Sequence, residues 1–250
     1  MKNALIGSTG FVGSNIANSK LLEFENFFCS TNIHEAAGNY FDLVVCAAPS
    51  AKKWFAIQNP LEDKMVIQNL INDLKLISAK KFILISTIDV YDIPYNKNED
   101  DDPEPSSLNP YGLHRRMLEQ FVENNFNNSC IIRLPGLFGP GLKKNIIYDL
   151  LNNNEVGKIN AANIYQWYPI CHFTEDLHNI IKSDIKLINI SPEPIETGLI
   201  LKLFNIDLKE LLTDKIDKYY NIKSKYINLL NGSGEYHLSA SDVISDLTAY

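Results

Sequence analysis

The chain has 250 residues, of which 45% are hydrophobic and 21% charged, a composition typical of one medium α/β domain rather than of a disordered chain. The formal net charge is −7 and Lys and Arg form no dense run, so nucleic acid is not an expected partner. The sequence contains no membrane span or signal peptide and its four cysteines are scattered without a CxxC pair, so we expect a cytoplasmic protein with reduced thiols.

The first 140 residues alternate strand-like and helix-like segments. We predict strands over residues 2–6, 26–30, 42–47, 81–86 and 130–134, and helices over residues 11–22, 60–78 and 111–126. The apolar stripe of the second helix is predicted to be Leu61, Met65, Leu70, Leu74 and Ile77. Continuous apolar strands separated by helices predict an α/β fold, with a Rossmann-like, doubly wound parallel sheet.

After about residue 140 the pattern loosens. Helices are expected over residues 145–151, 174–182, 196–204 and 208–213, and a late strand over residues 187–190. We therefore divide the chain into a Rossmann-like region, residues 1–140, and a small, mostly helical lobe, residues 141–250, which is not an independent domain. The acidic segment NEDDDPEP, residues 98–105, is interpreted as a solvated connection rather than a metal site.

The motif GSTGFVG lies directly between the first strand and the first helix. Gly7 permits a tight turn, Gly10 allows the backbone to approach a pyrophosphate, and Gly13 allows close packing of helix on strand. The free N–H groups at the helix start would meet the anion. The predicted dinucleotide loop consists of Gly7, Thr9, Gly10, Phe11, Val12 and Gly13. The alternative is a glycine-rich turn without a ligand.

This GxxGxxG spacing resembles the short-chain dehydrogenase/reductase superfamily, and most of all its extended branch, which acts on nucleotide-linked sugars. Four further stretches agree in order and spacing, namely DLVVCAAP (42–49), FILISTIDVYD (82–92), PYGLHRRMLE (110–119) and RLPGLFGPG (133–141). The resemblance implies a cofactor at the carboxyl edge of the strands and a nucleotide-sugar substrate under the C-terminal lobe. It also implies a homodimer formed through helices on the flank of the sheet.

The implied cofactor is NAD or NADP. The second strand ends in CSTN (29–32), which has no acid for a ribose 2′-hydroxyl. Ser30, Thr31 and Asn32 could instead accept a 2′-phosphate, which favours NADP, or they could cap the next helix. Only about ten residues separate this strand from the next, so an abbreviated adenine side is expected. The other cofactor contacts implied by the resemblance are Cys46, Ala47, Ala48, Tyr111, Arg115, Leu134, Pro135 and Gly136.

The resemblance assigns the chemistry to Tyr111 and Thr87. In the family, the tyrosine phenol exchanges a proton with the substrate while hydride moves to or from the nicotinamide, and the Ser/Thr hydroxyl positions the substrate oxygen. A lysine four residues after the tyrosine holds the ribose and favours the phenolate. Here Arg115 takes that place, on the helix face of Tyr111. It keeps the charge but presents a planar fork. The alternative is a solvent-facing arginine.

We therefore predict an NAD(P)-dependent oxidoreductase or epimerase that acts on a nucleotide-activated sugar. Arg115 and the abbreviated adenine side keep a second hypothesis open, a cofactor-binding sensor or scaffold without catalysis. A third hypothesis is a sugar-nucleotide dehydratase with Asp89 as its base, although Ile88 stands where dehydratases have an aspartate. Capping of a loop is the alternative role for Asp89.

Two further groups are candidates for the substrate side. Lys143 and Lys144 could meet a nucleotide diphosphate or form a solvated pair, while Trp167, Tyr168 and His172 could line the substrate pocket. For His172, a place in the core or on the surface is the alternative. The spacing reveals neither a Ser-His-Asp arrangement nor a cluster of metal ligands, so neither a hydrolase nor a metalloenzyme is predicted.

Overall fold

A computed structural model describes residues 2–207 and 215–250, so the helix predicted over residues 208–213 lies outside the described residues. Within them, a large sheet contains six parallel strands. In spatial order these are β2 (Asn26–Phe28), β1 (Asn3–Ile6), β3 (Tyr40–Cys46), β4 (Ser78–Thr87), β6 (Ser129–Leu134) and β9 (Leu187–Asn189). The predicted α/β class and Rossmann-like parallel sheet are confirmed.

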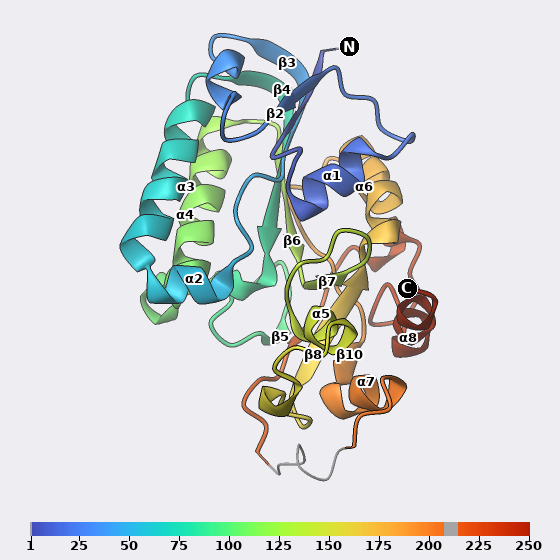
Figure 1. Cartoon of the computed structure of the whole chain (residues 1–250). Helices are drawn as coiled ribbons and strands as arrows, with labels where there is room; N and C mark the ends of the chain where they lie inside the picture. The colour runs from blue at the N-terminus through green and yellow to red at the C-terminus, as the bar shows by residue number, and fades with distance from the viewer. Residues whose placement is uncertain (1, 208–214) are drawn as a thin grey trace.

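Helices cover both faces of this sheet (Figure 1). One face packs against α3 (Pro60–Leu74) and α4 (Pro110–Asn125), and the other against α1 (Phe11–Ala17) and α6 (Phe173–Lys182). Successive strand residues pack against opposite helix layers. In β1, Ala4 and Ile6 face α3 and α4, whereas Leu5 faces α1 and α6. The strands are apolar throughout because both faces are buried.

A second, three-stranded sheet lies at the carboxyl end of the large one (Figure 1). Its strands, in order, are β10 (Pro194–Glu196), β8 (Ile164–Pro169) and β7 (Gly136–Phe138). Helices α5 (Ile146–Leu151), α7 (Thr197–Leu203) and α8 (Ala240–Ala249) share a core with it. β9 follows residue 140 in the sequence but belongs to the large sheet, whereas β7 precedes residue 140 but belongs to the small sheet. The predicted boundary at residue 140 therefore does not separate the two sheets. The division into two parts stays a prediction.

Several element ends differ from the predictions. Helix α1 ends at Ala17 rather than at residue 22, because polar residues follow it and Ser19 Oγ accepts from Leu21 N at 3.2 Å to form a turn. Helix α3 ends at Leu74 because Ser78 already pairs with β3. The predictions missed α2 (Lys53–Gln58), α8, the small sheet, and the pair formed by β5 (Tyr95–Lys97) and β11 (Asn221–Ile222).

The predicted apolar stripe of α3 was wrong at its N-terminal half. Leu61 is 77% exposed and Met65 is 59% exposed. The buried face consists of Asp63, Ile67, Ile71 and Leu74. A polar residue at the first position of the true stripe concealed it, although the spacing of these four residues fits the helical period.

The acidic segment is not simply solvated. The Glu99 carboxylate accepts from the Asn189 N–H at 2.8 Å, the Ser224 hydroxyl at 2.6 Å and the Lys225 N–H at 2.9 Å. One side chain thus fastens residues 98–105 to β9 and to the segment after β11. No helix among the described residues is long and apolar enough to cross a membrane.

Candidate active site

The glycine loop follows β1 at the carboxyl edge of the large sheet. Gly7 has φ +84°, and a Cβ there would lie 2.5 Å from Ala48 N. A Cβ on Gly13 would lie 2.1 Å from Gly7 O, so both positions require glycine. Gly10 caps α1 without a side-chain bond, which leaves the first-turn N–H groups of α1 without a side-chain acceptor. Thr9, Phe11 and Val12 lie in this loop and the first turn, where Thr9 is exposed.

The ends of four neighbouring parallel strands carry the other predicted contacts to the same edge. These ends are Ile6 of β1, Cys46 of β3, Thr87 of β4 and Leu134 of β6. Ala47 and Ala48 continue β3 beside Gly7, while Pro135 and Gly136 continue β6. The Cys46 side chain is fully buried, and burial raises the pKa of its thiol to about 12, so only its backbone is available to a ligand.

Tyr111 and Thr87 come together because α4 begins against the end of β4. Asn109 caps α4 by accepting from Tyr111 N at 3.0 Å, and a Cβ on Gly112 would lie 2.2 Å from Asp89 O. Burial raises the pKa of the Tyr111 phenol to about 12, whereas the charge of Arg115 and a hydrogen bond with Thr87 oppose this rise. The Tyr111 hydroxyl and the Thr87 side chain therefore lie close together.

Arg115 is buried, with 2% of its surface exposed, so the alternative of a solvent-facing arginine is wrong. Its guanidinium carbon lies 4.3 Å from the centre of the Tyr111 ring. Nη1 donates to Asp63 Oδ2 at 2.5 Å and Nη2 donates to the Ser50 carbonyl, while Nε has no partner among the described residues. His114 Nδ1 also contacts Asp63 Oδ2, at 2.7 Å. Asp63 of α3 thus fixes the arginine against the tyrosine.

Asp89 has two partners that the sequence did not indicate. Lys53 Nζ lies 2.6 Å from Asp89 Oδ1, and the Tyr220 hydroxyl donates to the same oxygen at 2.7 Å. Burial and the charge of Asp89 raise the pKa of Tyr220 well above its usual range, and Asp89 also raises the pKa of Tyr111. Tyr220 lies 131 residues after Asp89, so only the fold could reveal this contact.

Lys144 lies in the segment between β7 and α5. Burial and the positive charges of Lys52 and Arg115 lower its pKa to about 8. Its ammonium has no hydrogen bond or ion pair with any described residue. The segment lies against α1, because Asn15 Nδ2 donates to Pro140 O at 3.0 Å. Such a gathering of cations attracts anions. The neighbouring Lys143 is exposed.

A buried ion pair fixes β4, α4 and β6 together beside these residues. Arg133 Nε and Nη2 donate to the two Glu119 oxygens at 3.0 and 2.7 Å. The Ser86 hydroxyl donates to Glu119 at 2.5 Å, and Arg133 Nη1 donates to the Tyr91 hydroxyl at 2.8 Å. Because Ser86 precedes Thr87, this network holds the end of β4 against the helix that carries Tyr111.

The other predicted pocket residues pack in the core or pair with another element. Trp167 and Tyr168 are buried in two different core clusters, and Tyr168 donates to Asp176. His172 Nε2 instead contacts Asp246 of α8 at 2.7 Å. The structure thus places Trp167 and Tyr168 in the core and pairs His172 with the last helix.

The region after β2 is short, as predicted. Asn32 Oδ1 accepts from Cys29 N at 2.7 Å, and Thr31 Oγ1 lies 3.0 Å from Cys29 Sγ. Asn32 therefore closes a turn with the end of β2, and its side chain does not cap the helix that follows. Only the short 3₁₀ helix η1 (Ile33–Ala36) separates β2 from β3, and β2 is the edge strand of the sheet.

Comparison with known families decides the relationship. The model of the NAD dependent epimerase/dehydratase family matches residues 28–175. The chain belongs to this family. The matched region contains Thr87, Tyr111 and Arg115, whereas the glycine loop precedes it. The predicted resemblance to NAD-dependent epimerases and dehydratases is therefore confirmed. A search of curated protein sequences gave no match for this epimerase/dehydratase family member.

Solved structures of three reaction classes share the fold of this family member. A dTDP-4-dehydrorhamnose reductase from Bacillus anthracis, in complex with NADP, has a TM-score of 0.75 and 18% identity, and covers 100% of this chain and 98% of its own. A UDP-glucose 4-epimerase from Thermotoga maritima, with UDP-glucose, has a TM-score of 0.72 and 14% identity, and the match covers 100% of this chain and 98% of the epimerase. A dTDP-glucose 4,6-dehydratase from Streptomyces venezuelae, with NAD bound, has a TM-score of 0.74 and 15% identity, and the match covers 100% of this chain and 96% of the dehydratase.

Proposed function

We propose that the protein is an NAD(P)-dependent oxidoreductase or epimerase that acts on a nucleotide-activated sugar. The observation that carries this proposal is the contact of Tyr111 with Thr87 and Arg115 at the edge where the glycine loop lies. Tyr111 would exchange a proton with a substrate hydroxyl or carbonyl, and Thr87 would orient that oxygen. Structural neighbours that are reductases, epimerases and dehydratases support this class of reaction.

The chain's residues fit the dinucleotide that the family name implies. The tight turn at Gly7 and the close approach at Gly13 leave backbone rather than side chains beside the start of α1. When bound, the nicotinamide would accept or supply the hydride. The absence of an acidic residue in CSTN (29–32) favours NADP, and both cofactors occur among the neighbours.

Arg115 has a defined part in this proposal. A buried phenol with a pKa of about 12 is a poor base near neutral pH, so it needs a nearby cation to favour its ionised form. The guanidinium over the ring supplies that charge. Asp63 partly offsets it, because its negative charge raises the pKa of Tyr111.

Lys52, Lys144 and Arg115 would bind phosphate groups of the nucleotide sugar or of the cofactor. Burial and the nearby positive charges of Lys52 and Arg115 lower the pKa of Lys144, whose segment lies against α1. An ammonium that lacks a protein partner gains most from an anion that binds beside it. Residues 141–250 would then supply the remaining substrate contacts.

Two measurements on the purified chain test the proposal. Titration calorimetry should detect binding of NADPH or NADH, and complete lack of binding of both would exclude the proposal. Hydride exchange with nucleotide sugars should disappear in Tyr111→Phe. The control Tyr95→Phe changes a tyrosine that is 42% exposed and should keep the activity.

A cofactor-binding protein without catalysis is the second candidate. It is favoured by the contacts of Arg115, whose Nη1 and Nη2 already serve Asp63 and Ser50. This candidate predicts cofactor binding without hydride exchange, and equal behaviour of the wild type and Tyr111→Phe. Exchange that depends on Tyr111 would exclude it.

The dehydratase is the third candidate. It is favoured by Asp89, which lies near Tyr111 and is bonded to Lys53 and Tyr220. Loss of water elimination in Asp89→Asn, with cofactor affinity unchanged, would support this reaction. Retention of all activity in that variant would assign Asp89 to the alternative role of holding its loop.

We also propose a homodimer formed through α2 and α3. Trp54 is 57%, Leu61 77% and Met65 59% exposed, so these helices present an apolar surface that the core leaves uncovered. Light scattering should give the mass of a dimer for the wild type and of a monomer for Leu61→Glu. The control Leu21→Glu, at a residue 47% exposed outside these helices, should remain dimeric.

A further inference from the structure

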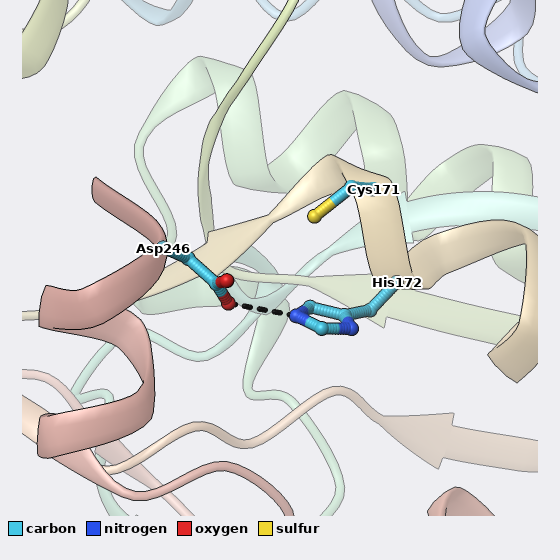
Figure 2. A group of neighbouring side chains, drawn as sticks. All are labelled: Cys171, His172 and Asp246. Carbon is cyan, nitrogen blue, oxygen red and sulfur yellow. Dashed lines mark hydrogen bonds and ion pairs between the residues drawn. The ribbon is translucent and has the colours of Figure 1, made fainter. Parts of the chain in front are cut away.

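Cys171, His172 and Asp246 form a group whose possible ligand atoms all lie within 4.8 Å of one another. Cys171 and His172 belong to the 3₁₀ helix η5 (Ile170–His172), whereas Asp246 belongs to α8. The three side chains come from segments 74 residues apart and converge (Figure 2). None of them belongs to the proposed catalytic group.

An ion pair explains only part of this arrangement. His172 Nε2 lies 2.7 Å from Asp246 Oδ2, and the Cys171 side chain also interacts with the imidazole. Figure 2 shows the Cys171 thiol pointing into the space between the carboxylate and the imidazole. In a nucleophile relay, the two ring nitrogens would serve the nucleophile and the carboxylate separately. Here the thiol, the imidazole and the carboxylate each place one possible ligand atom within 4.8 Å of the other two, close enough for the three side chains to share an ion.

We propose that Cys171, His172 and Asp246 bind a divalent transition metal ion of the Zn²⁺ class. A thiolate, an imidazole and a carboxylate form a ligand set typical of zinc, whereas Mg²⁺ and Ca²⁺ require oxygen ligands throughout. Cys171 is exposed, and the side chains of His172 and Asp246 are 40% and 32% exposed, so water can complete the coordination. The ion would exchange with the solvent.

The position of the group indicates a structural role for the ion. It would link η5 to α8, the last helix, which otherwise holds to the small core through Val243 and Leu247. The 3₁₀ helix η5 contacts α1, and Ile170 packs on Gly139, where a Cβ would lie 2.5 Å from its side chain. Metal binding would therefore stabilise the packing of α8 against η5, the 3₁₀ helix that contacts α1 after the glycine loop.

Co²⁺ is a suitable probe because a thiolate ligand gives it a strong charge-transfer absorption. The full chain, treated with a chelator under a reducing agent, should bind one Co²⁺ with this absorption, and Zn²⁺ should abolish the signal. Cys171→Ala should lose the charge-transfer absorption, and Asp246→Asn should bind Co²⁺ at least tenfold more weakly. The control Cys29→Ala removes the other thiol that is not fully buried and should behave as the wild type.

The thermal midpoint supplies a second measurement that does not depend on activity or on NAD(P). Zn²⁺ should raise the midpoint of the wild type and of Cys29→Ala, and should leave that of Cys171→Ala unchanged. The proposal is overturned if no charge-transfer absorption appears, or if it persists in Cys171→Ala. It is equally overturned if Mg²⁺ stabilises the wild type as much as Zn²⁺ does.

Discussion

Replacing Glu119 with alanine should lower the free energy of unfolding by about 3–5 kcal/mol, because it leaves a buried arginine without its counter-charge. Glu119 is fully buried and Arg133 is 1% exposed. The substitution removes both hydrogen bonds between the guanidinium and the carboxylate, at 3.0 and 2.7 Å. Arg133 would keep only its bond to the Tyr91 hydroxyl.

Urea denaturation of matched variants measures this cost. Glu123→Ala is the control, since Glu123 lies on the same helix and pairs with Arg116 at 2.9 Å, but its side chain is 41% exposed. Exposed pairs contribute about 0–1 kcal/mol, so this variant should resemble the wild type. For a chain of this size, the loss in Glu119→Ala corresponds to a decrease in thermal midpoint of roughly 6–20 °C.

A double variant that removes both charges tests whether the unpaired charge of Arg133 causes the loss of stability. Glu119→Leu combined with Arg133→Met replaces the ion pair with apolar groups, which in buried sites is often neutral or stabilising. The double variant should therefore be more stable than Glu119→Ala. The reasoning is refuted if Glu119→Ala loses no more stability than Glu123→Ala, or if the double variant is no more stable than Glu119→Ala.

Three further predictions concern the candidate site. Arg115→Met should shift the pH dependence of hydride exchange to higher pH by about 1–3 units, because the guanidinium lowers the pKa of Tyr111. Lys144→Ala should weaken binding of inorganic pyrophosphate about tenfold in calorimetry. Wild-type affinity should fall as the pH rises through about 8, where Lys144 loses its proton, and the variant should lack this fall. Gly13→Ala should cost about 1–3 kcal/mol in urea denaturation, whereas Gly157→Ala, which has open space, should cost almost nothing.

The large sheet could be predicted because its strands are buried on both faces and read as apolar runs between helices. The small sheet could not, because β7 and β10 are three residues long and carry no alternating pattern. Helix α8 had a usable signal, since Ser239 and Asp242 form a capping box immediately before an amphipathic segment. The register of α3 failed for a physical reason, because buried Asp63 made the true face look polar.

In the candidate site too, features that depend on local sequence could be predicted, whereas contacts between residues far apart in the sequence could not. The positions of the glycine loop, Thr87 and Tyr111 could be predicted because each lies at its own strand end or helix start. Lys53 and Tyr220 could not, because their contacts with Asp89 join residues 36 and 131 positions apart without a motif. Cys171 and Asp246 are separated in the same manner, so spacing alone gave no indication of a metal site.

The arginine at position 115 is best understood together with Asp63. A lysine ammonium is a single point of charge, whereas the guanidinium plane contacts the Tyr111 ring while its edge donates to Asp63 and to the Ser50 carbonyl. These contacts orient the charge from two sides, so its place over the phenol does not depend on a bound ribose. The negative charge of Asp63 also reaches Tyr111 and opposes the arginine. The acidity of the phenol therefore depends on its burial, on Arg115 and on the carboxylates of Asp89 and Asp63, rather than on the motif position alone.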